Sequence, residues 1–279
     1  MKKYELVTEL SKEFFGKTLF RIRALVSFDC VEEGEIGGWV ESEENLSHDG
    51  NAWVSGHARV SDNARVSGHA WVFGNAQVSD NARVYGNARV SGEAQVSDNA
   101  RVYGHAWVFG NAQVSDNARV YGNARVSGEA RVSDNARVSG HAWVFGNAQV
   151  SDNARVSGDA RVFDNARVSG NAWVSGDARV SDNARVSGHA WVSGNAWVSG
   201  DAWVSGAAHY ITVGPIGSEG GTLTAFRQAD NSILVTRGCF RGTIEEFVAA
   251  VIERHGETHY AAEYGIVIKL IEARLAEID

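Results

Sequence analysis

A six-residue repeat runs without interruption through the middle of the chain. Valine occupies position 54 and every sixth position to 204, which makes 26 valines, and alanine stands two residues before each of them. Residues two apart point to the same side of an extended segment, so each unit places Ala and Val on one side and the intervening residue on the other. A strand this short cannot bury its apolar side alone. The repeat therefore predicts a solenoid in which stacked units share an Ala/Val core.

A second period gives the number of units in one turn. The dipeptide Asp–Asn recurs in every third hexad, at 62, 80, 98, 116, 134 and 152. Three hexads per turn predict a triangular prism, with two-residue corners at which Gly and Asn accept a positive φ. The next Asp–Asn pairs stand at 164 and 182. One hexad is missing there, so the outward rows are expected to move by one face.

The spacing of aliphatic and small residues resembles that of a known family. Val54 is followed four residues later by Ala58, Val60 by Ala64, and so on through the run. This pattern resembles the hexapeptide-repeat, left-handed parallel β-helix family over more than half of the chain. The resemblance implies the fold class, a mainly β, left-handed triangular solenoid, and it alone supplies the handedness.

Composition shifts divide the chain into three parts. Residues 1–50 are expected to form an N-terminal cap with a strand at 19–25, because an open solenoid end exposes core and unpaired backbone. Residues 51–208 form the solenoid. Residues 209–279 are expected to form a small α+β domain with strands at 210–213, 222–227 and 232–237. A capping box at Thr243–Glu246 predicts a first helix that ends near His255. A second helix is predicted over Tyr260 to Ala276, with apolar residues at 266, 270 and 271.

Two short segments suggest an origin and an activity through resemblance. Gly37–Val40, Asn45–Ser47 and Gly50–Ala52 resemble uncharacterised enterobacterial and prophage hexapeptide-repeat proteins that are often labelled acetyltransferases. Gly238–Phe247 resembles a small domain of unknown function at the ends of phage-encoded proteins. The family's acyltransferases use a histidine base at a subunit interface and a loop projecting from the prism. The corresponding candidates are His69, His105 and His141, but they repeat one another and no hexad carries an insertion, so no catalytic residue, cofactor or metal site is assigned.

One outward row combines aromatic and basic residues. At three hexads per turn, successive turns place on one face Trp71, Arg89, Trp107, Arg125, Trp143 and Arg161. Beside them lie Phe73, Phe109, Phe145 and Phe163. Alternating rings and guanidinium groups permit cation–π stacking, and such an apolar face is typical of an interface with a second copy or a host protein. The alternative is stacking that only stabilises the solenoid.

Two further sets of outward residues are candidates for function. The first is a possible anion-binding stripe for a phosphate-bearing ligand, made of Arg83, Tyr85, Arg101, Tyr103, Arg119 and Tyr121. Its structural alternative is a basic row balanced by the acidic row of Asp80, Asp98 and Asp116. The second is an aromatic collar of Trp191, Trp197 and Trp203, one on each face of the last turn, packed under the C-terminal domain.

Composition excludes several classes of partner. The net charge of −8 argues against non-specific nucleic-acid binding, and no apolar run approaches the roughly 18 residues of a membrane span. Cys30 and Cys239 are the only cysteines, which favours the cytoplasm of a bacterial host. The leading hypothesis is a non-enzymatic structural or binding protein of phage or prophage origin that self-associates. The alternatives are a phage anti-defence protein that sequesters a host nucleotide signal, and an acyl-CoA-dependent acyltransferase.

Overall fold

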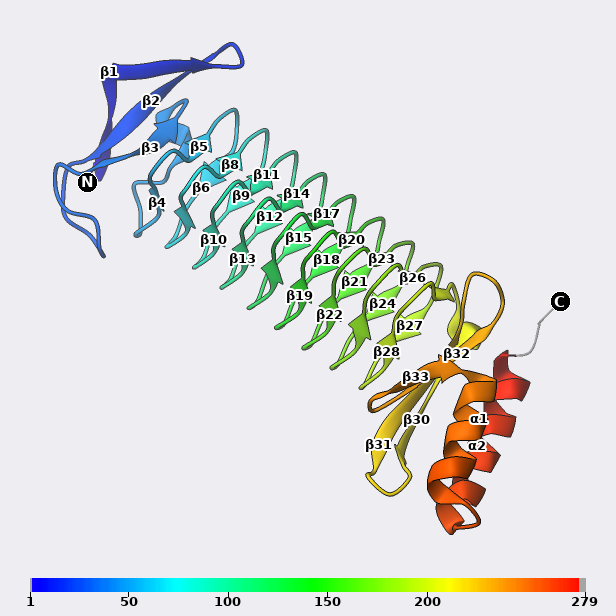
Figure 1. Ribbon diagram of the computed structural model, residues 1–279. Coiled ribbons are helices and arrows are strands. Elements are labelled where there is room, and N and C mark those ends of the chain that lie inside the picture. Colours follow the sequence, from blue (N-terminus) through cyan, green and yellow to red (C-terminus); the bar gives the residue numbers. More distant parts are fainter. Residues whose placement is uncertain (1, 276–279) are drawn as a thin grey trace. The chain divides into compact units, whose positions relative to one another are not determined.

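The computed structural model describes residues 2–275 and contains two compact units, Met1–Asp152 and Asn153–Asp279. Both units contain turns of a parallel β-solenoid, about nine in all (Figure 1). Every hexad forms one two-residue strand that ends at its valine, from β4 (Trp53–Val54) to β29 (Trp203–Val204). Within each unit, the strands pair in register with those three hexads away, as Arg89 does with Trp71. The predicted fold class and the turn of three hexads are confirmed, while the handedness stays a prediction.

The solenoid core consists of two residue types. Every alanine and valine of the hexads, from Ala52 to Val204, is at most 1% exposed. The interior of a triangular turn has room for only small and β-branched side chains, and valine also suits the extended backbone. Backbone N–H groups at and just after a strand donate to the following turn, for example Trp71 N to Ala88 O at 2.9 Å and Phe73 N to Val90 O at 2.9 Å.

The strands of the first unit form three sheets, one for each side of the triangle. One sheet runs β3 (Ile36–Val40), β5 (Arg59–Val60), β8 (Gln77–Val78), β11 (Gln95–Val96), β14 (Gln113–Val114), β17 (Arg131–Val132) and β20 (Gln149–Val150). The second runs β4, β7 (Trp71–Val72), β10 (Arg89–Val90), β13 (Trp107–Val108), β16 (Arg125–Val126) and β19 (Trp143–Val144). The third runs β6 (Arg65–Val66), β9 (Arg83–Val84), β12 (Arg101–Val102), β15 (Arg119–Val120) and β18 (Arg137–Val138).

The N-terminal cap is a β-hairpin that extends the first sheet. The predicted strand is present as β2 (Lys17–Ala24), and it pairs in antiparallel fashion with β1 (Tyr4–Phe14), which the sequence did not indicate. β2 also pairs with β3, and β3 pairs in parallel with β5 (Figure 1). A short 3-10 helix (Glu43–Asn45) follows, and Leu46 bridges to Val66. The first turn of the solenoid therefore begins near residue 36, earlier than the position 51 expected from the hexads.

Side chains of the cap replace the missing preceding turn. In the ladder, each backbone carbonyl accepts from the turn before it, and the first turn has none. Lys3 Nζ donates to Gly50 O at 3.1 Å and to Ala52 O at 2.8 Å. The buried Asn45 Nδ2 donates to Asp62 O at 2.9 Å and to Ala64 O at 3.0 Å. Lys3 thus supplies donors to carbonyls of the first turn, and Asn45, which lies in the first turn, supplies donors to carbonyls of the second, without a further copy of the repeat.

The second unit contains three shorter stacks of the same kind. They are β21 (Arg155–Val156), β24 (Trp173–Val174) and β27 (Trp191–Val192); β22 (Arg161–Val162), β25 (Arg179–Val180) and β28 (Trp197–Val198); and β23 (Arg167–Val168), β26 (Arg185–Val186) and β29. Asp164 follows β22 and Asp182 follows β25, and these two corners stack on each other, with Asn165 N donating to Asp182 O at 2.9 Å. Within this unit, the Asp–Asn corners therefore stack with the shifted phase that the sequence predicts.

The C-terminal domain is an antiparallel sheet with two helices. After a 3-10 helix (Ala207–His209) come β30 (Tyr210–Ile216), β31 (Gly221–Arg227), β32 (Ile233–Arg237) and β33 (Phe240–Thr243), of which β33 was not expected. Helix α1 (Ile244–His255) begins with the predicted capping box between Thr243 and Glu246. Helix α2 (His259–Leu275) covers the second predicted helix, whose last residue, Ala276, lies outside the described residues. Within residues 2–275, neither helix is long and apolar enough to cross a membrane.

The sheet of this domain buries both of its faces. One face, with Leu223 and Ala225, packs on Phe247 and Ile271 of the helices. The other face meets the last turn of the solenoid, where Trp197 N donates to Thr224 Oγ1 at 3.1 Å and Thr236 Oγ1 donates to Trp197 O at 3.2 Å. Phe226, fully buried on that face, lies in the strand that packs against β28 and β29. Of the apolar residues expected on α2, Ile271 is buried, whereas Ile266 and Leu270 are exposed.

The residue that turns each corner differs from expectation. The left-handed conformation belongs to the first corner residue, which is Gly or Asp, with φ of 57° at Asp116 and 71° at Gly122. The asparagines of the hexads are not among the residues with positive φ, so the expectation for Asn was wrong. At a glycine corner the turns approach closely, since a Cβ on Gly122 would lie 3.0 Å from Gly140 N. At an aspartate corner the side chain adds hydrogen bonds, which are described below.

Candidate binding surfaces

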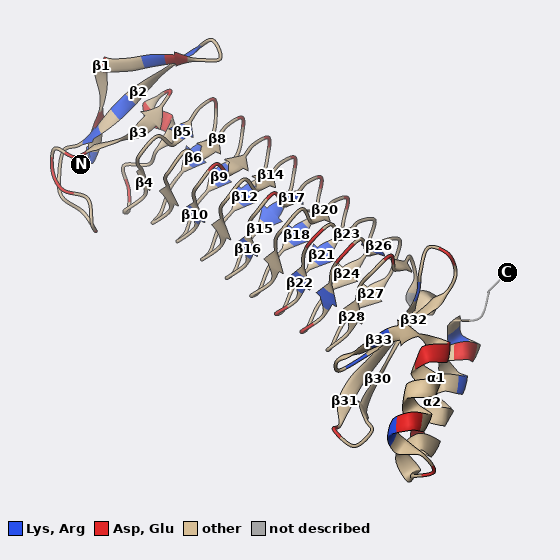
Figure 2. Ribbon diagram, viewed as in Figure 1, with Lys and Arg blue, Asp and Glu red and all other residues tan. Residues whose placement is uncertain are grey.

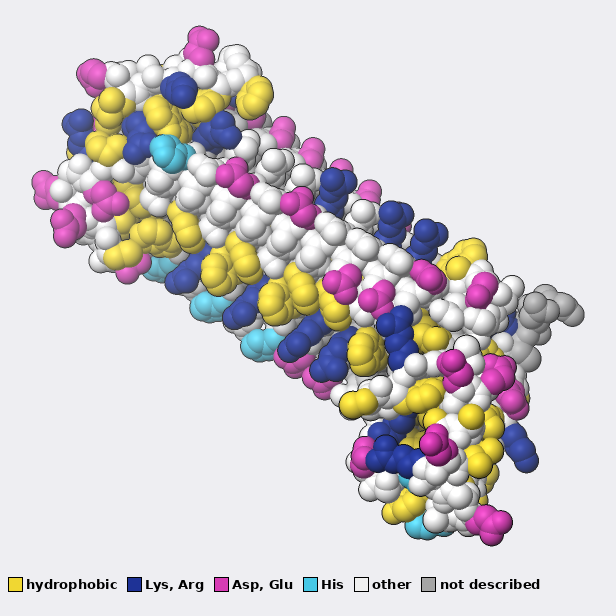
Figure 3. Space-filling view, in the orientation of Figure 1, with side chains coloured by type: hydrophobic (Ala, Val, Ile, Leu, Met, Phe, Trp, Pro, Cys, Tyr) yellow, Lys and Arg dark blue, Asp and Glu magenta, His cyan; other side chains and the backbone are white. Residues whose placement is uncertain are grey.

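The Trp/Arg face consists of Trp71, Arg89, Trp107, Arg125 and Trp143, together with Phe73, Phe109 and Phe145. Strands β7, β10, β13, β16 and β19 place the first five in register on one side of the first unit. Figure 3 shows hydrophobic side chains alternating with basic ones along this side of the solenoid. The predicted alternation of rings and guanidinium groups is therefore present.

The indole rings of Trp107 and Trp143 lie back over the preceding turn. Trp107 Nε1 donates to Ser91 Oγ at 3.1 Å, and Trp143 Nε1 donates to Ser127 Oγ at 3.0 Å. Each indole also packs on the phenylalanine two residues on, with ring centroids 4.5 Å apart for Trp107 and Phe109. The two serines are only 5% exposed as a result, and the rings themselves are half-buried.

The expected cation–π stacking is not formed on this face. Within the described chain, no cation–π contact or ion pair joins Arg89 or Arg125 to a neighbour, and the cation–π pairs lie in the N-terminal cap, such as Arg59 over Phe14 at 4.8 Å. The hydrogen bond to serine draws each indole towards the corner and away from the guanidinium of the same row. Both arginines are therefore exposed and available to a partner.

Arg161 and Phe163, the remaining residues assigned to this row, belong to the second unit. There Arg161 lies on β22 and pairs in register with Arg179 on β25. Their place in a common interface with the first unit stays a prediction.

The Arg/Tyr row, which consists of Arg83, Tyr85, Arg101, Tyr103, Arg119 and Tyr121, also stacks in register. Figure 2 shows the basic residues of β9, β12 and β15 along one side of the solenoid. The tyrosine rings stack nearly parallel, 4.9 Å and 5.0 Å apart, and burial between neighbours raises the pKa of Tyr103. A shallow groove of about 230 Å³ lies between Arg65, Arg83 and Tyr85 at the start of the row. Anion binding along it stays a prediction.

The acidic row is satisfied by hydrogen bonds and does not pair with the arginines. Asp116 Oδ2 accepts from Ser115 Oγ at 2.9 Å and from the backbone N–H of Asp134 at 3.3 Å, and the same pattern recurs along the row. No ion pair within 4.0 Å involves Arg83, Arg101 or Arg119 among residues 2–275. Two aspartates of such corners also form ion pairs with cations outside the hexads. Lys17 of the N-terminal cap pairs with Asp62, and Arg241 of the C-terminal domain pairs with Asp182 at 3.2 Å. The carboxylates find donors in their own corner and in the stacked corner of the next turn, so the expected balance between the two rows does not take the form of direct ion pairs.

The aromatic collar forms only in part. Trp191, Trp197 and Trp203 do fall on three different sheets of the last turn. Trp197 is half-buried at the contact with Thr224 and Thr236, whereas Trp191 is 54% exposed and Trp203 is 52% exposed. Trp191 instead stacks on Trp173, with ring centroids 5.2 Å apart. The expectation that all three pack under the C-terminal domain is corrected, because polar groups of its sheet, and Phe226, already cover the end of the core.

The three histidines suggested by the acyltransferase resemblance are exposed corner residues. His69 N and His105 N each donate to a glycine carbonyl of the next turn at 2.7 Å. Strands follow one another every six residues from Trp53 to Val204, so no loop projects beside His69, His105 or His141 in this stretch. No group of three or more metal-binding side chains occurs among the described residues.

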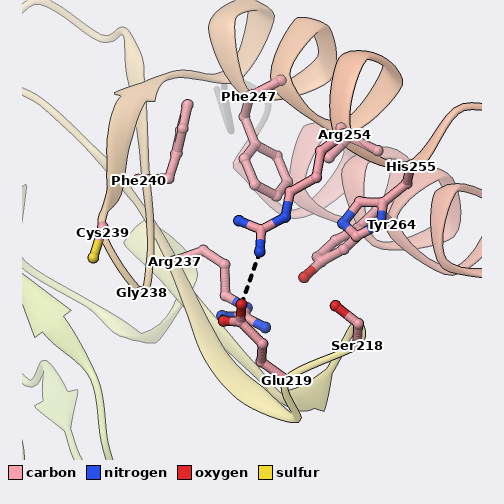
Figure 4. A pocket seen from close by; sticks show the side chains of 12 residues that line it. Ser218, Glu219, Arg237, Gly238, Cys239, Phe240, Phe247, Arg254, His255 and Tyr264 are labelled. Carbon is pink, nitrogen blue, oxygen red and sulfur yellow. Dashed lines mark hydrogen bonds and ion pairs between the residues drawn. The ribbon is translucent and has the colours of Figure 1, made fainter.

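The C-terminal domain contains a cavity that the sequence did not reveal. It has a volume of about 210 Å³ and lies between the β30–β31 turn, the β32–β33 turn, α1 and α2 (Figure 4). Its charged residues, Glu219, Arg237 and Arg254, come from three separate segments, so no local motif connects them.

A comparison with protein families finds a β-solenoid repeat. The sequence model of the YdcK β-solenoid repeat matches eight segments, residues 58–74, 76–92, 94–110, 112–128, 130–146, 148–162, 160–176 and 178–194. Successive segments start three hexads apart except at 148 and 160, where the phase of the repeat slips. No curated protein matches the chain. Together with the in-register strands and the Ala/Val core, this match supports a structural β-helix protein of the β-solenoid repeat type.

Proposed function

We propose that this β-solenoid is a non-enzymatic scaffold that self-associates through its Trp/Arg face. The observation that carries the proposal is the order Trp-Arg-Trp-Arg-Trp on strands β7 to β19, held in register by the backbone. The rings are half-buried and the arginines between them are exposed and unpaired within the described chain. A rigid face with unused cations and partly exposed rings is suited to a partner of the same pattern.

The alternation makes the face complementary to an antiparallel copy of itself. A two-fold axis that lies along the strands, between the turns of Trp107 and Arg125, places Trp107 opposite Arg125 of the second copy. The same operation places Arg89 opposite Trp143. Trp107 and Trp143 then each meet a guanidinium, at about 0.5–2 kcal/mol for each pair, and arginines do not face one another, while Trp71 lies beyond the paired residues.

The dimer is expected to be weak. Five turns at about 4.8 Å span only about 20 Å, so the contact is smaller than a standard interface and the Kd is expected in the micromolar range. Sedimentation equilibrium over a concentration series is therefore the appropriate assay.

A pair of matched variants tests the role of the face. Arg125→Glu replaces one cation opposite a ring and is expected to shift the protein to monomer. Arg101→Glu makes the same charge change on the Arg/Tyr row, and the mass should not change. A wild-type protein that stays monomeric at high micromolar concentration, or an Arg125→Glu variant that associates like wild type, would refute the proposal.

The origin of the chain belongs to the same proposal. The resemblance of residues 37–52 and 238–247 to phage and prophage proteins supports a phage or prophage gene expressed in the cytoplasm of a bacterial host. The acyltransferase alternative has less support, because the hexads between 53 and 204 form no loop that could wall a substrate site.

A further inference from the structure

The cavity of the C-terminal domain has an apolar part and a charged mouth. The rings of Phe240, Phe247 and Tyr264 form the apolar part, with centroids 5.1 Å apart for Phe240 and Phe247 and 5.6 Å apart for Phe247 and Tyr264. Figure 4 shows the Arg254 guanidinium reaching from α1 across the mouth towards Glu219. The arrangement offers a contact surface for an apolar group beside two guanidinium groups.

Arg237 is a largely buried cation whose hydrogen-bonding capacity is only partly used. Its side chain is 11% exposed, Nη2 donates to Ile216 O at 3.0 Å, and Nη1 lies 3.5 Å from Glu219 Oε2. Nε is buried and has no hydrogen-bond partner among residues 2–275. A buried guanidinium with an unused N–H donor costs free energy while no acceptor is present, so such a site favours the binding of an anion.

One carboxylate serves both arginines. Glu219 lies 2.8 Å from Arg254 and 3.5 Å from Arg237, so two positive charges share one negative charge. Its side chain is 59% exposed and sits on the turn between Gly217 and Gly220, both of which have positive φ. The Glu219 carboxylate therefore occupies the position that the carboxylate of a ligand would take, and it is held there from an exposed turn.

We propose that this cavity binds a small organic acid. Its aromatic or branched apolar body would lie among Phe240, Phe247 and Tyr264, and its carboxylate would lie between Arg237 and Arg254, where Arg forks recognise planar carboxylates. The volume of about 210 Å³ is below that of drug-sized sites, so the ligand is a single-ring compound. This site is independent of the proposed self-association.

The test uses the full chain and isothermal titration calorimetry with three probes. Phenylacetate is expected to bind with a Kd of about 1 mM or below. The uncharged 2-phenylethanol lacks the carboxylate and inorganic phosphate lacks the apolar ring, so each is expected to bind at least tenfold more weakly. If phosphate binds as well as phenylacetate, the site recognises charge alone and the proposal fails.

Three variants make the assignment specific. Arg254→Met should weaken phenylacetate binding about tenfold or more, because it removes one arm of the carboxylate clamp. Glu219→Gln should tighten binding several-fold, because it removes the internal competitor; loss of a merely structural contact would not do so. Lys269→Met, on the exposed surface of α2, should leave binding unchanged, and circular dichroism confirms that each variant is folded. Equal binding by Arg254→Met and wild type, unchanged binding by Glu219→Gln, or no saturable heat with phenylacetate at about 10 mM overturns the proposal.

Discussion

Asp116 occupies a corner at which backbone conformation and side-chain hydrogen bonding can be separated by mutation. Its φ is 57°, and its Oδ2 accepts from Ser115 Oγ at 2.9 Å and from Asp134 N at 3.3 Å. The left-handed conformation costs a residue with a Cβ about 1 kcal/mol, and each exposed hydrogen bond contributes about 0.5–1 kcal/mol. In a glycine variant, loss of the hydrogen bonds and relief of the strain oppose each other, whereas in an alanine variant the hydrogen bonds are lost and the strain stays.

The free energy of local opening should follow a defined order. Asp116→Ala loses both hydrogen bonds. Alanine also keeps the strain of the left-handed backbone without the local hydrogen bonding that helps an Asp side chain to adopt it, so the variant should cost about 2 kcal/mol. Asp116→Gly loses the same bonds but relieves the strain, which leaves a cost of about 0.5 kcal/mol. Asp116→Asn keeps an acceptor oxygen and removes a charge from the acidic row, so it should be neutral within a few tenths of a kcal/mol.

Native-state hydrogen exchange of the Asn99 amide measures this order, since that N–H donates to the backbone carbonyl of residue 116 at 2.8 Å, a bond that every variant keeps. A solenoid need not unfold in one step, so a local probe is preferable to a global melting curve. Asp116→Ala should speed exchange about thirtyfold and Asp116→Gly about twofold. Asn117→Ala, at the second corner residue, should have little effect because its φ is not positive. Equal exchange rates in the Ala and Gly variants would refute the account of the corner.

Two further predictions concern the cap and the Arg/Tyr row. Burial lowers the pKa of Lys3 to about 8 from its ordinary value of 10.5, so between these values the unfolded chain binds more protons than the folded one and stability rises with pH. The free energy of unfolding of the cap, measured by urea titration, should therefore increase by about 1 kcal/mol between about pH 7.5 and 9.5 after allowance for partial solvation, and Lys3→Met should abolish the slope; a flat wild-type profile contradicts this. Above pH 10 the gain ends, because burial raises the pKa of Tyr4 and only the unfolded tyrosine ionises. If the Arg/Tyr row binds phosphate-bearing ligands, a cyclic dinucleotide should raise the melting temperature of the wild type but not of Arg83→Gln, and no shift in the wild type would exclude this role.

The backbone of the solenoid could be predicted because its information is local and repeated. Val54 to Val204 define one strand every six residues, and the spacing of Asp–Asn defines the turn, so both follow from counting. The capping box at Thr243 was equally readable, because it involves residues only three apart. The cap was less readable: Lys3 and Asn45 act on carbonyls of Gly50, Ala52, Asp62 and Ala64, and nothing in the sequence links these partners.

Side-chain directions could not be predicted from the period. Alternation placed Trp107 and Arg89 on one outward row, but a hydrogen bond to Ser91 in the preceding turn decides where the indole lies, and it prevents the expected cation–π stack. The same limitation applies to Trp191 and Trp203, whose exposure depends on how far the sheet of the C-terminal domain covers the last turn.

The sequence by itself determined the Ala/Val core, the turn of three hexads, the phase slip after Asp152 and the start of α1, because each of these depends on residues close together or on strict repetition. Tertiary structure decided which corner residue is left-handed, how the acidic row is satisfied and how the ends of the solenoid are closed. It also brought Glu219, Arg237 and Arg254 around one cavity. These features depend on contacts between segments that are distant in the chain, and such contacts arise only when the turns and the C-terminal elements pack.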